Sequence, residues 1–124
     1  MRTAAQDLGD AAEAQVAAYL ARLDWQILAT RLRVGRAELD IVAVDPMPPA
    51  TLVIVEVRWR GRRDFGLPEE TVDQRKWARL RRAALTLRDT GRTANGVAIP
   101  SLPLRFDLIV TEPDRPLRHH RFVS

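Results

Sequence analysis

The sequence contains no cysteine and very little serine, histidine or lysine among its 124 residues. Without cysteine there can be no disulfide bond, zinc–thiolate site, iron–sulfur cluster or thiol nucleophile. The two serines, Ser101 and Ser124, and the adjacent pair His119 and His120 leave a Ser/His/Asp hydrolase almost nothing to use. Walker A and GxGxxG patterns are also absent, which argues against an enzyme with a nucleotide cofactor.

Long apolar runs are missing as well. No stretch approaches the roughly 18 apolar residues that a membrane span needs, and no signal-peptide-like run follows Met1. We therefore expect a cytoplasmic protein that does not contact membranes. The composition, 46% hydrophobic and 29% charged, together with the length, predicts one globular domain over residues 1–124.

The charge is basic and unevenly distributed. Nineteen arginines and one lysine, Lys76, give a net charge of +4. Residues 1–57 carry a net −3, residues 58–92 a net +6 and residues 93–124 a net +1. A basic block of this kind is expected where a protein binds a polyanion such as nucleic acid. Because a solvated helix face is the more common explanation, charge alone leaves both interpretations open.

The hydrophobic pattern predicts two helices and at least four strands. Thr3 and Gln6 match a capping box that starts an amphipathic helix over residues 4–23. The other expected elements are strands at 26–30, 38–44, 51–58 and 104–111, a helix at 71–89, loops at 60–71 and about 90–103, and one more candidate strand at 117–123. The order α-β-β-β-α-β predicts an α/β domain with a mixed β-sheet flanked by helices, in two or three layers.

Two carboxylates stand in strands that are expected to be buried. The proline-rich connection at residues 45–50 makes the second and third strands an antiparallel hairpin, and symmetric closure about Pro48 places Asp40 opposite Glu56. Such neighbours repel each other unless a cation lies between them, and Mg²⁺ prefers carboxylate oxygens. A structural ion-pair network that includes Arg58, on the same strand face as Glu56, explains the pattern equally well.

Two helix residues are predicted to approach the same place. Glu13 lies at the margin of the apolar face of the first helix, which makes it a third candidate carboxylate. An ordinary exposed glutamate is the alternative. Lys76 lies inside the apolar stripe of the second helix, so we expect it to present its ammonium group to the carboxylates or to a bound phosphate. Its alternative is to extend past the core into water.

The loop after the third strand mixes arginine, glycine and one aromatic residue, a combination that binds phosphates and stacks on bases. The candidate nucleic-acid-binding residues are Arg60, Arg62 and Arg63 of this loop together with Arg75 and Arg79 on the solvent side of the second helix. His119 and His120 make a poor metal site, because adjacent strand residues point to opposite faces. Arg105 and Asp107 share a strand face and are expected to pair with each other.

Motifs over about residues 8–111 resemble the bacterial YraN family. The matching runs include Leu8-Gly-Asp-Ala-Ala-Glu13, Ala37-Glu-Leu-Asp40, Glu56-Val-Arg58 and Arg105-Phe-Asp-Leu-Ile-Val110. That family is similar to Holliday-junction-resolvase-like endonucleases of the restriction-endonuclease-like, PD-(D/E)xK class. The resemblance implies a restriction-endonuclease-like core and a Mg²⁺- or Mn²⁺-dependent endonuclease acting on DNA, branched or structured DNA included.

The resemblance also implies roles for individual residues. Glu13, Asp40 and Glu56 become the acidic metal-site residues, and the triplet that ends in Arg58 replaces Glu-x-Lys. Lys76, which faces inward by helical periodicity, is expected to supply the missing ammonium group, so Arg58 and Lys76 complete the candidate catalytic residues. Arg58 stands where related nucleases have lysine; arginine is a poor proton acceptor but stabilises phosphoryl charge. The alternatives are a catalytically inactive nucleic-acid-binding module of the same fold and a protein-interaction factor. Resolvase-like enzymes often pair, so a homodimer is compatible with the resemblance.

Overall fold

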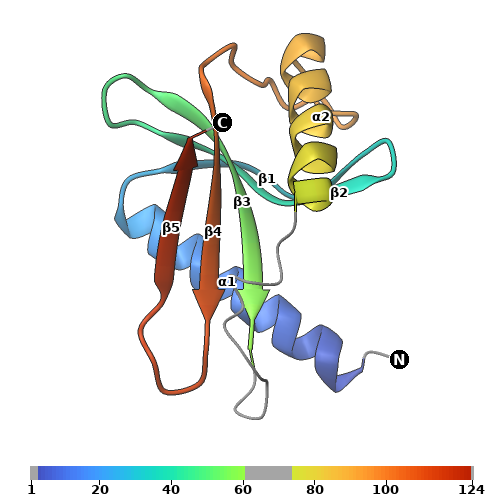
Figure 1. The fold of residues 1–124 in the computed structure, drawn as a ribbon. Coiled ribbons are helices and arrows are strands. Elements are labelled where there is room, and N and C mark those ends of the chain that lie inside the picture. Colours follow the sequence, from blue (N-terminus) through green and yellow to red (C-terminus); the bar gives the residue numbers. More distant parts are fainter. Residues whose placement is uncertain (1–2, 61–73, 124) are drawn as a thin grey trace.

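The computed structural model describes residues 3–60 and 74–123, and these form two helices and five strands (Figure 1). The elements are α1 (Ala4–Arg22), β1 (Gln26–Val34), β2 (Ala37–Asp45), β3 (Thr51–Trp59), α2 (Gln74–Thr90), β4 (Leu104–Thr111) and β5 (Arg118–Val123). The order α-β-β-β-α-β-β corrects the expected order, which ended one strand earlier. β5 is added because it pairs with β4, although its run of basic residues lacks the apolar alternation of a strand.

All five strands belong to one mixed sheet, in the order β1-β2-β3-β4-β5. β2 pairs antiparallel with β1 and with β3, β4 pairs antiparallel with β5, and β3 and β4 run parallel. Parallel neighbours need a crossover connection, and α2 lies in the segment that connects β3 to β4. The mixed α/β class expected from the sequence is confirmed.

The β2–β3 hairpin has the register expected from its proline-rich connection. Ile41 lies opposite Val55 and Asp45 opposite Thr51, so the numbers of paired residues add up to 96. The ladder ends at Ile41 and Val55, one pair before Asp40 and Glu56. The two strands therefore separate at the place where the two carboxylates stand.

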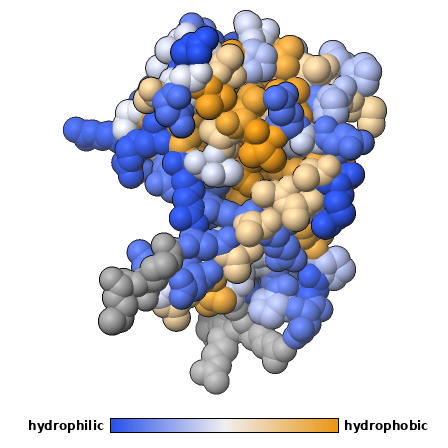
Figure 2. Space-filling view, turned by 180° about the vertical axis from the view of Figure 1, so that it is seen from behind, coloured by the Kyte–Doolittle hydropathy of each residue, from blue (hydrophilic) through white to orange (hydrophobic). Residues whose placement is uncertain are grey.

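The helices cover opposite faces of the sheet and make three layers. The core accordingly consists of two apolar clusters, because α1 packs its buried residues against one face of the sheet and α2 packs against the other. The first cluster includes Leu39, Ile54, Leu80, Ala84, Leu87 and Phe106, and the second includes Val16, Leu20, Ile41, Val53, Val55 and Ile109. Seen from behind, apolar residues gather at the height of α2 and hydrophilic residues surround them (Figure 2).

The ends of the helices follow their sequence signals. The Gln6 N–H donates to Thr3 Oγ1 at 3.1 Å and the Thr3 N–H donates to Gln6 Oε1 at 2.8 Å, which completes the predicted capping box of α1. α2 ends before Gly91, whose φ of 76° is the left-handed conformation that terminates helices. The expected helix start at residue 71 and the loop from residue 61 lie outside the described residues. No helix in the described ranges is long and apolar enough to span a membrane.

Candidate functional site

Asp40 stands at the fork where β2 leaves β3. Beyond the last ladder pair, the Val57 N–H donates to Asp40 Oδ2 at 2.9 Å, so the side chain takes a hydrogen bond from the main chain of the neighbouring strand. The Glu56 carboxyl is close enough for its charge to raise the pKa of Asp40. The hairpin register thus brings together the two carboxylates that the sequence paired.

Glu56 receives two cations, one from its own strand and one from α2. It is only 5% exposed. Lys76 Nζ lies 2.6 Å from Glu56 Oε1, and Arg58 Nη2 lies 3.6 Å from the same oxygen. Lys76 faces the sheet, as its place in the apolar stripe predicts. Arg58 Nε is buried and has no hydrogen-bond partner among the described residues, so its guanidinium keeps an unused donor.

Glu13 reaches the same region from α1 and is paired with Arg31. Arg31 Nε donates to Glu13 Oε2 at 2.5 Å, and the same guanidinium forms an ion pair with Asp10. Arg31 has a φ of 49° inside β1, a backbone conformation that non-glycine residues seldom adopt. Arg31 is not among the residues predicted from the sequence, because an arginine in a strand with irregular alternation carries no signal of this pairing.

The three carboxylates act on one another electrostatically. Burial and, after it, the charge of Glu56 raise the pKa of Asp40 to about 7, although the hydrogen bond from the Val57 N–H opposes the shift. Burial, followed by the charges of Glu38 and Glu56, raises the pKa of Glu13. Removal from water and a neighbouring negative charge both favour the protonated form of a carboxyl group.

A cleft of about 390 Å³ opens beside Glu13 and Asp40, where α1 meets β1, β2 and β3. Its walls carry Gln6, Gly9, Asp10, Ala12, Glu13, Arg31, Glu38, Asp40, Val57 and Trp59. Its volume falls within the range of about 300–1,000 Å³ that is usual for ligand sites. A substrate group in this cleft would lie directly against Asp40.

The donor set fits a magnesium ion held by two protein carboxylates. Mg²⁺ takes hard oxygen ligands and is often bound by one or two carboxylates together with water and substrate phosphate. Asp40 and Glu56 supply such a pair; Glu56 is also paired with Lys76, as Glu13 is with Arg31. Within residues 3–60 and 74–123, no group of three or more histidine, aspartate or glutamate side chains is placed to hold a metal. Water and substrate would therefore complete the shell.

The five predicted nucleic-acid-binding residues separate into three groups. Arg75 and Arg79 are exposed on α2. Arg60 is only 7% exposed, so most of its side chain is covered, and its main-chain N–H donates to the Thr111 carbonyl at 3.0 Å. Arg62 and Arg63 lie outside the described residues. The exposed part of the predicted basic surface is therefore the outer side of α2.

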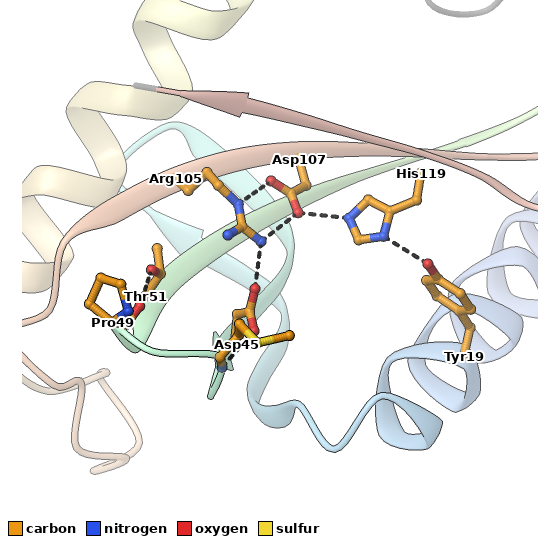
Figure 3. A network of polar contacts seen from close by, with 8 residues as sticks. Tyr19, Asp45, Pro49, Thr51, Arg105, Asp107 and His119 are labelled. Carbon is orange, nitrogen blue, oxygen red and sulfur yellow. Dashed lines mark hydrogen bonds and ion pairs between the residues drawn. The ribbon is translucent and has the colours of Figure 1, made fainter.

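A second polar network lies away from this cleft, and the sequence anticipated only one of its contacts (Figure 3). Arg105 Nε donates to Asp107 Oδ1 at 2.8 Å as expected, and Arg105 also bridges to Asp45 at 3.1 Å. His119 Nε2 lies 2.7 Å from Asp107 Oδ2, and its Nδ1 lies 2.9 Å from the Tyr19 hydroxyl. Asp107 is fully buried. The network joins α1, β2, β4 and β5.

Residues 12–111 match the sequence model of the "Uncharacterised protein family UPF0102". A UPF0102 protein of Moorella thermoacetica is 38% identical over 111 residues, which cover 89% of this chain and 84% of the relative. One of Sorangium cellulosum is 41% identical over 101 residues, covering 81% of this chain and 65% of the relative. One of Desulforamulus reducens is 42% identical over 77 residues, or 62% of each chain. The matches thus span under two thirds of the length of the last two relatives.

Proposed function

The chain belongs to the UPF0102 (YraN) family, and from its carboxylate site we propose that it is a metal-dependent endonuclease that hydrolyses phosphodiester bonds in DNA. One observation carries the proposal: Asp40 and Glu56 meet at the fork between β2 and β3, with Lys76 on Glu56. Carboxylates beside an ammonium group are the arrangement that metal-assisted phosphoryl transfer needs. The restriction-endonuclease-like assignment of the core is part of this proposal.

Asp40 and Glu56 would hold Mg²⁺ or Mn²⁺, which supplies a polarised phosphoryl oxygen and an activated water when bound. The chain's own groups do the rest. The Val57 N–H fixes the Asp40 carboxylate, and Lys76 fixes Glu56. The Arg58 guanidinium, whose Nη2 lies 3.6 Å from Glu56 Oε1, would stabilise the negative charge that develops on the phosphate. Arg31 holds Glu13 in the wall of the cleft.

Lys76 supplies the ammonium group that is missing from the Glu-Val-Arg triplet, where Arg58 stands in place of lysine. In the nucleases that the sequence resembles, lysine stands at the position of Arg58. Here the ammonium group reaches Glu56 from α2 instead, at 2.6 Å. The proposal therefore assigns the lysine's role to Lys76 and charge stabilisation to Arg58.

The test is cleavage of labelled linear, flap and four-way-junction DNA in Mg²⁺, Mn²⁺ or EDTA. Asp40→Asn and Glu56→Gln should each lower cleavage by more than the roughly 10–100-fold that loss of an outer-shell group costs a metal site. Lys76→Ala should abolish turnover and remain folded by circular dichroism. Glu38→Gln is the matched control, because Glu38 lines the same cleft but pairs with Arg33.

Three other outcomes of this experiment would reject the proposed nuclease or its assigned site. Metal-independent DNA binding without cutting in any lane would identify a nucleic-acid-binding module of the same fold. Absence of binding even at low salt would overturn both nucleic-acid functions and leave the protein-interaction factor, in which the carboxylates are structural. Cleavage that survives in both Asp40→Asn and Glu56→Gln would remove the assigned site.

A further inference from the structure

A second hollow, of about 600 Å³, is lined by the turn that joins β1 to β2 and by one side of α2. The turn and α2 lie side by side in Figure 1. We call it the arginine groove. It is lined by Val34, Gly35, Arg36, Ala37, Arg79, Arg82, Ala83 and Thr86. Three of these residues are arginines and none is acidic, so its walls are positively charged around an apolar floor.

The charge of the groove is not neutralised within the described part of the chain. Arg36, Arg79 and Arg82 form no ion pair with any carboxylate of residues 3–60 and 74–123. Arginines elsewhere do have such partners: Arg105 pairs with two aspartates and Arg118 with Glu112. The groove therefore gathers guanidinium groups whose donors remain available to an external anion.

Both walls of the groove lead to the carboxylate pair. On α2, Arg79 lies one helical turn from Lys76, which contacts Glu56. On β2, Ala37 lies three residues before Asp40. An extended anion that follows the groove toward the N-terminal end of α2 therefore reaches Lys76 and Glu56, on the α2 side of the fork at which Asp40 stands.

We propose that the arginine groove binds the phosphodiester backbone of one nucleic-acid strand and directs it to Asp40 and Glu56. Guanidinium groups match phosphate oxygens bidentately, and the Thr86 hydroxyl adds one more donor. The apolar floor, formed by Val34, Ala37 and Ala83, suits the sugar side of a strand. The inference deepens the proposed function by naming where the substrate lies, and the binding itself does not require catalysis.

Fluorescence anisotropy of labelled DNA in EDTA tests the groove without cleavage. The variant is Arg79→Gln/Arg82→Gln, and the control is Arg22→Gln/Arg81→Gln. The control makes the same change in charge, both of its arginines are exposed, and Arg81 lies on α2 outside the groove. Circular dichroism checks the fold of each variant.

The groove variant should lose at least about tenfold in affinity at 100 mM salt and should lower the salt slope by about two phosphate contacts. The control should lose less than about twofold. Arg36→Gln, on the opposite wall, should weaken binding further when combined with the groove variant. Equal losses in the groove variant and the control would overturn the proposal, because net charge alone would then explain the binding.

Mononucleotide and inorganic phosphate distinguish a strand from a small anion. At constant ionic strength, neither should displace the labelled DNA at millimolar concentration. Displacement by either one, lost in Arg79→Gln/Arg82→Gln, would overturn the proposal in favour of a small-anion site.

Cleavage kinetics separate this inference from the proposed function. If both hold, Arg79→Gln/Arg82→Gln raises KM with little change in kcat, whereas Asp40→Asn removes kcat and keeps DNA affinity. Loss of binding in the groove variant of a protein that never cuts DNA supports the groove and rejects the nuclease. Unchanged binding in the groove variant of a protein that cuts DNA through Asp40 rejects the groove and supports the nuclease.

Discussion

Asp40 makes the stability of the folded protein depend on pH. Its pKa is raised to about 7, because the carboxyl is buried and faces Glu56, so the folded state holds this proton more tightly than the unfolded state does. The stabilisation is fully present below the unfolded pKa of about 4 and is lost as pH rises through about 7. Without a metal, the molecule is therefore under electrostatic strain at neutral and alkaline pH.

Asp40→Asn should relieve this strain. In EDTA the variant should unfold at a higher temperature than the wild type at pH 8.5, and the gain should shrink toward pH 5, where Asp40 is protonated in the folded state. The amide oxygen can still accept the Val57 N–H. Thermal unfolding at both pH values measures the effect. Asp89→Asn, an exposed control on α2, should show no such pH dependence, and an equal gain at both pH values for Asp40→Asn would contradict the argument.

At the scale of elements, β5 is attached by the polar network of Figure 3 as well as by its ladder with β4. His119 on β5 connects the buried Asp107 on β4 to Tyr19 on α1. Its ring also makes edge-to-face contacts with Tyr19 and Trp25, with centroids 5.6 Å apart in each case. The last strand is thus anchored to both the sheet and the first helix.

His119→Ala should lower the free energy of unfolding by about 1–3 kcal/mol, because it removes a partner from the fully buried Asp107. Tyr19→Phe removes only the hydroxyl and should cost about 0.5–1.5 kcal/mol. Urea denaturation of the two variants beside the wild type gives both values. A His119→Ala protein as stable as Tyr19→Phe would mean that Asp107 needs only Arg105.

Local patterns predicted most elements, because their signals lie within one segment. The capping box fixed the start of α1, and the proline-rich connection after Asp45 fixed the register of β2 against β3. β1 extends four residues beyond the expected Thr30, since pairing with β2 carries it to Val34. The candidate strand at 117–123 is confirmed as β5, although its Arg118-His-His-Arg121 run has no apolar alternation; pairing with β4 holds it in the sheet.

Some residues of the candidate site could also be predicted from local patterns, and others could not. The positions of Asp40 and Glu56 could be predicted from the register of the β2–β3 hairpin, and that of Lys76 from the helical periodicity of α2. Both signals are local patterns in the sequence. The approach of Arg31 to Glu13 depends on a left-handed backbone conformation next to a bulge, which strand alternation does not encode. The contact between His119 and Asp107 depends on the pairing of β4 with β5, which follows only once the sheet has formed.

At the scale of the whole molecule, folding joins two oppositely charged parts of the chain. Glu13, Asp40 and Glu56 come from the acidic stretch 1–57, and Arg79 and Arg82 come from the basic block 58–92. An acidic site that attracts a divalent cation thereby lies at the end of a basic groove that attracts a polyanion. The two kinds of ligand are drawn toward the fork between β2 and β3 from the two sides of the sheet.

Mg²⁺ should stabilise the whole fold if Asp40 and Glu56 bind it. At ten times its Kd, the ion should add about 1.4 kcal/mol to the free energy of unfolding. Thermal unfolding at pH 8 in MgCl₂, compared with EDTA and NaCl of equal ionic strength, measures the gain. Asp40→Asn/Glu56→Gln should abolish it. The same gain in that double variant would place any bound Mg²⁺ elsewhere.

The outer edge of β1 has a consequence for self-association. Long, regular edge strands are templates on which further chains add and sheets grow into aggregates. The edge of β1 is interrupted by the bulge between Ile27 and Ala29 and by the left-handed Arg31, and it carries the exposed charge of Arg33. The irregularity that brings Arg31 to Glu13 thus also closes this side of the sheet to fibril-like growth.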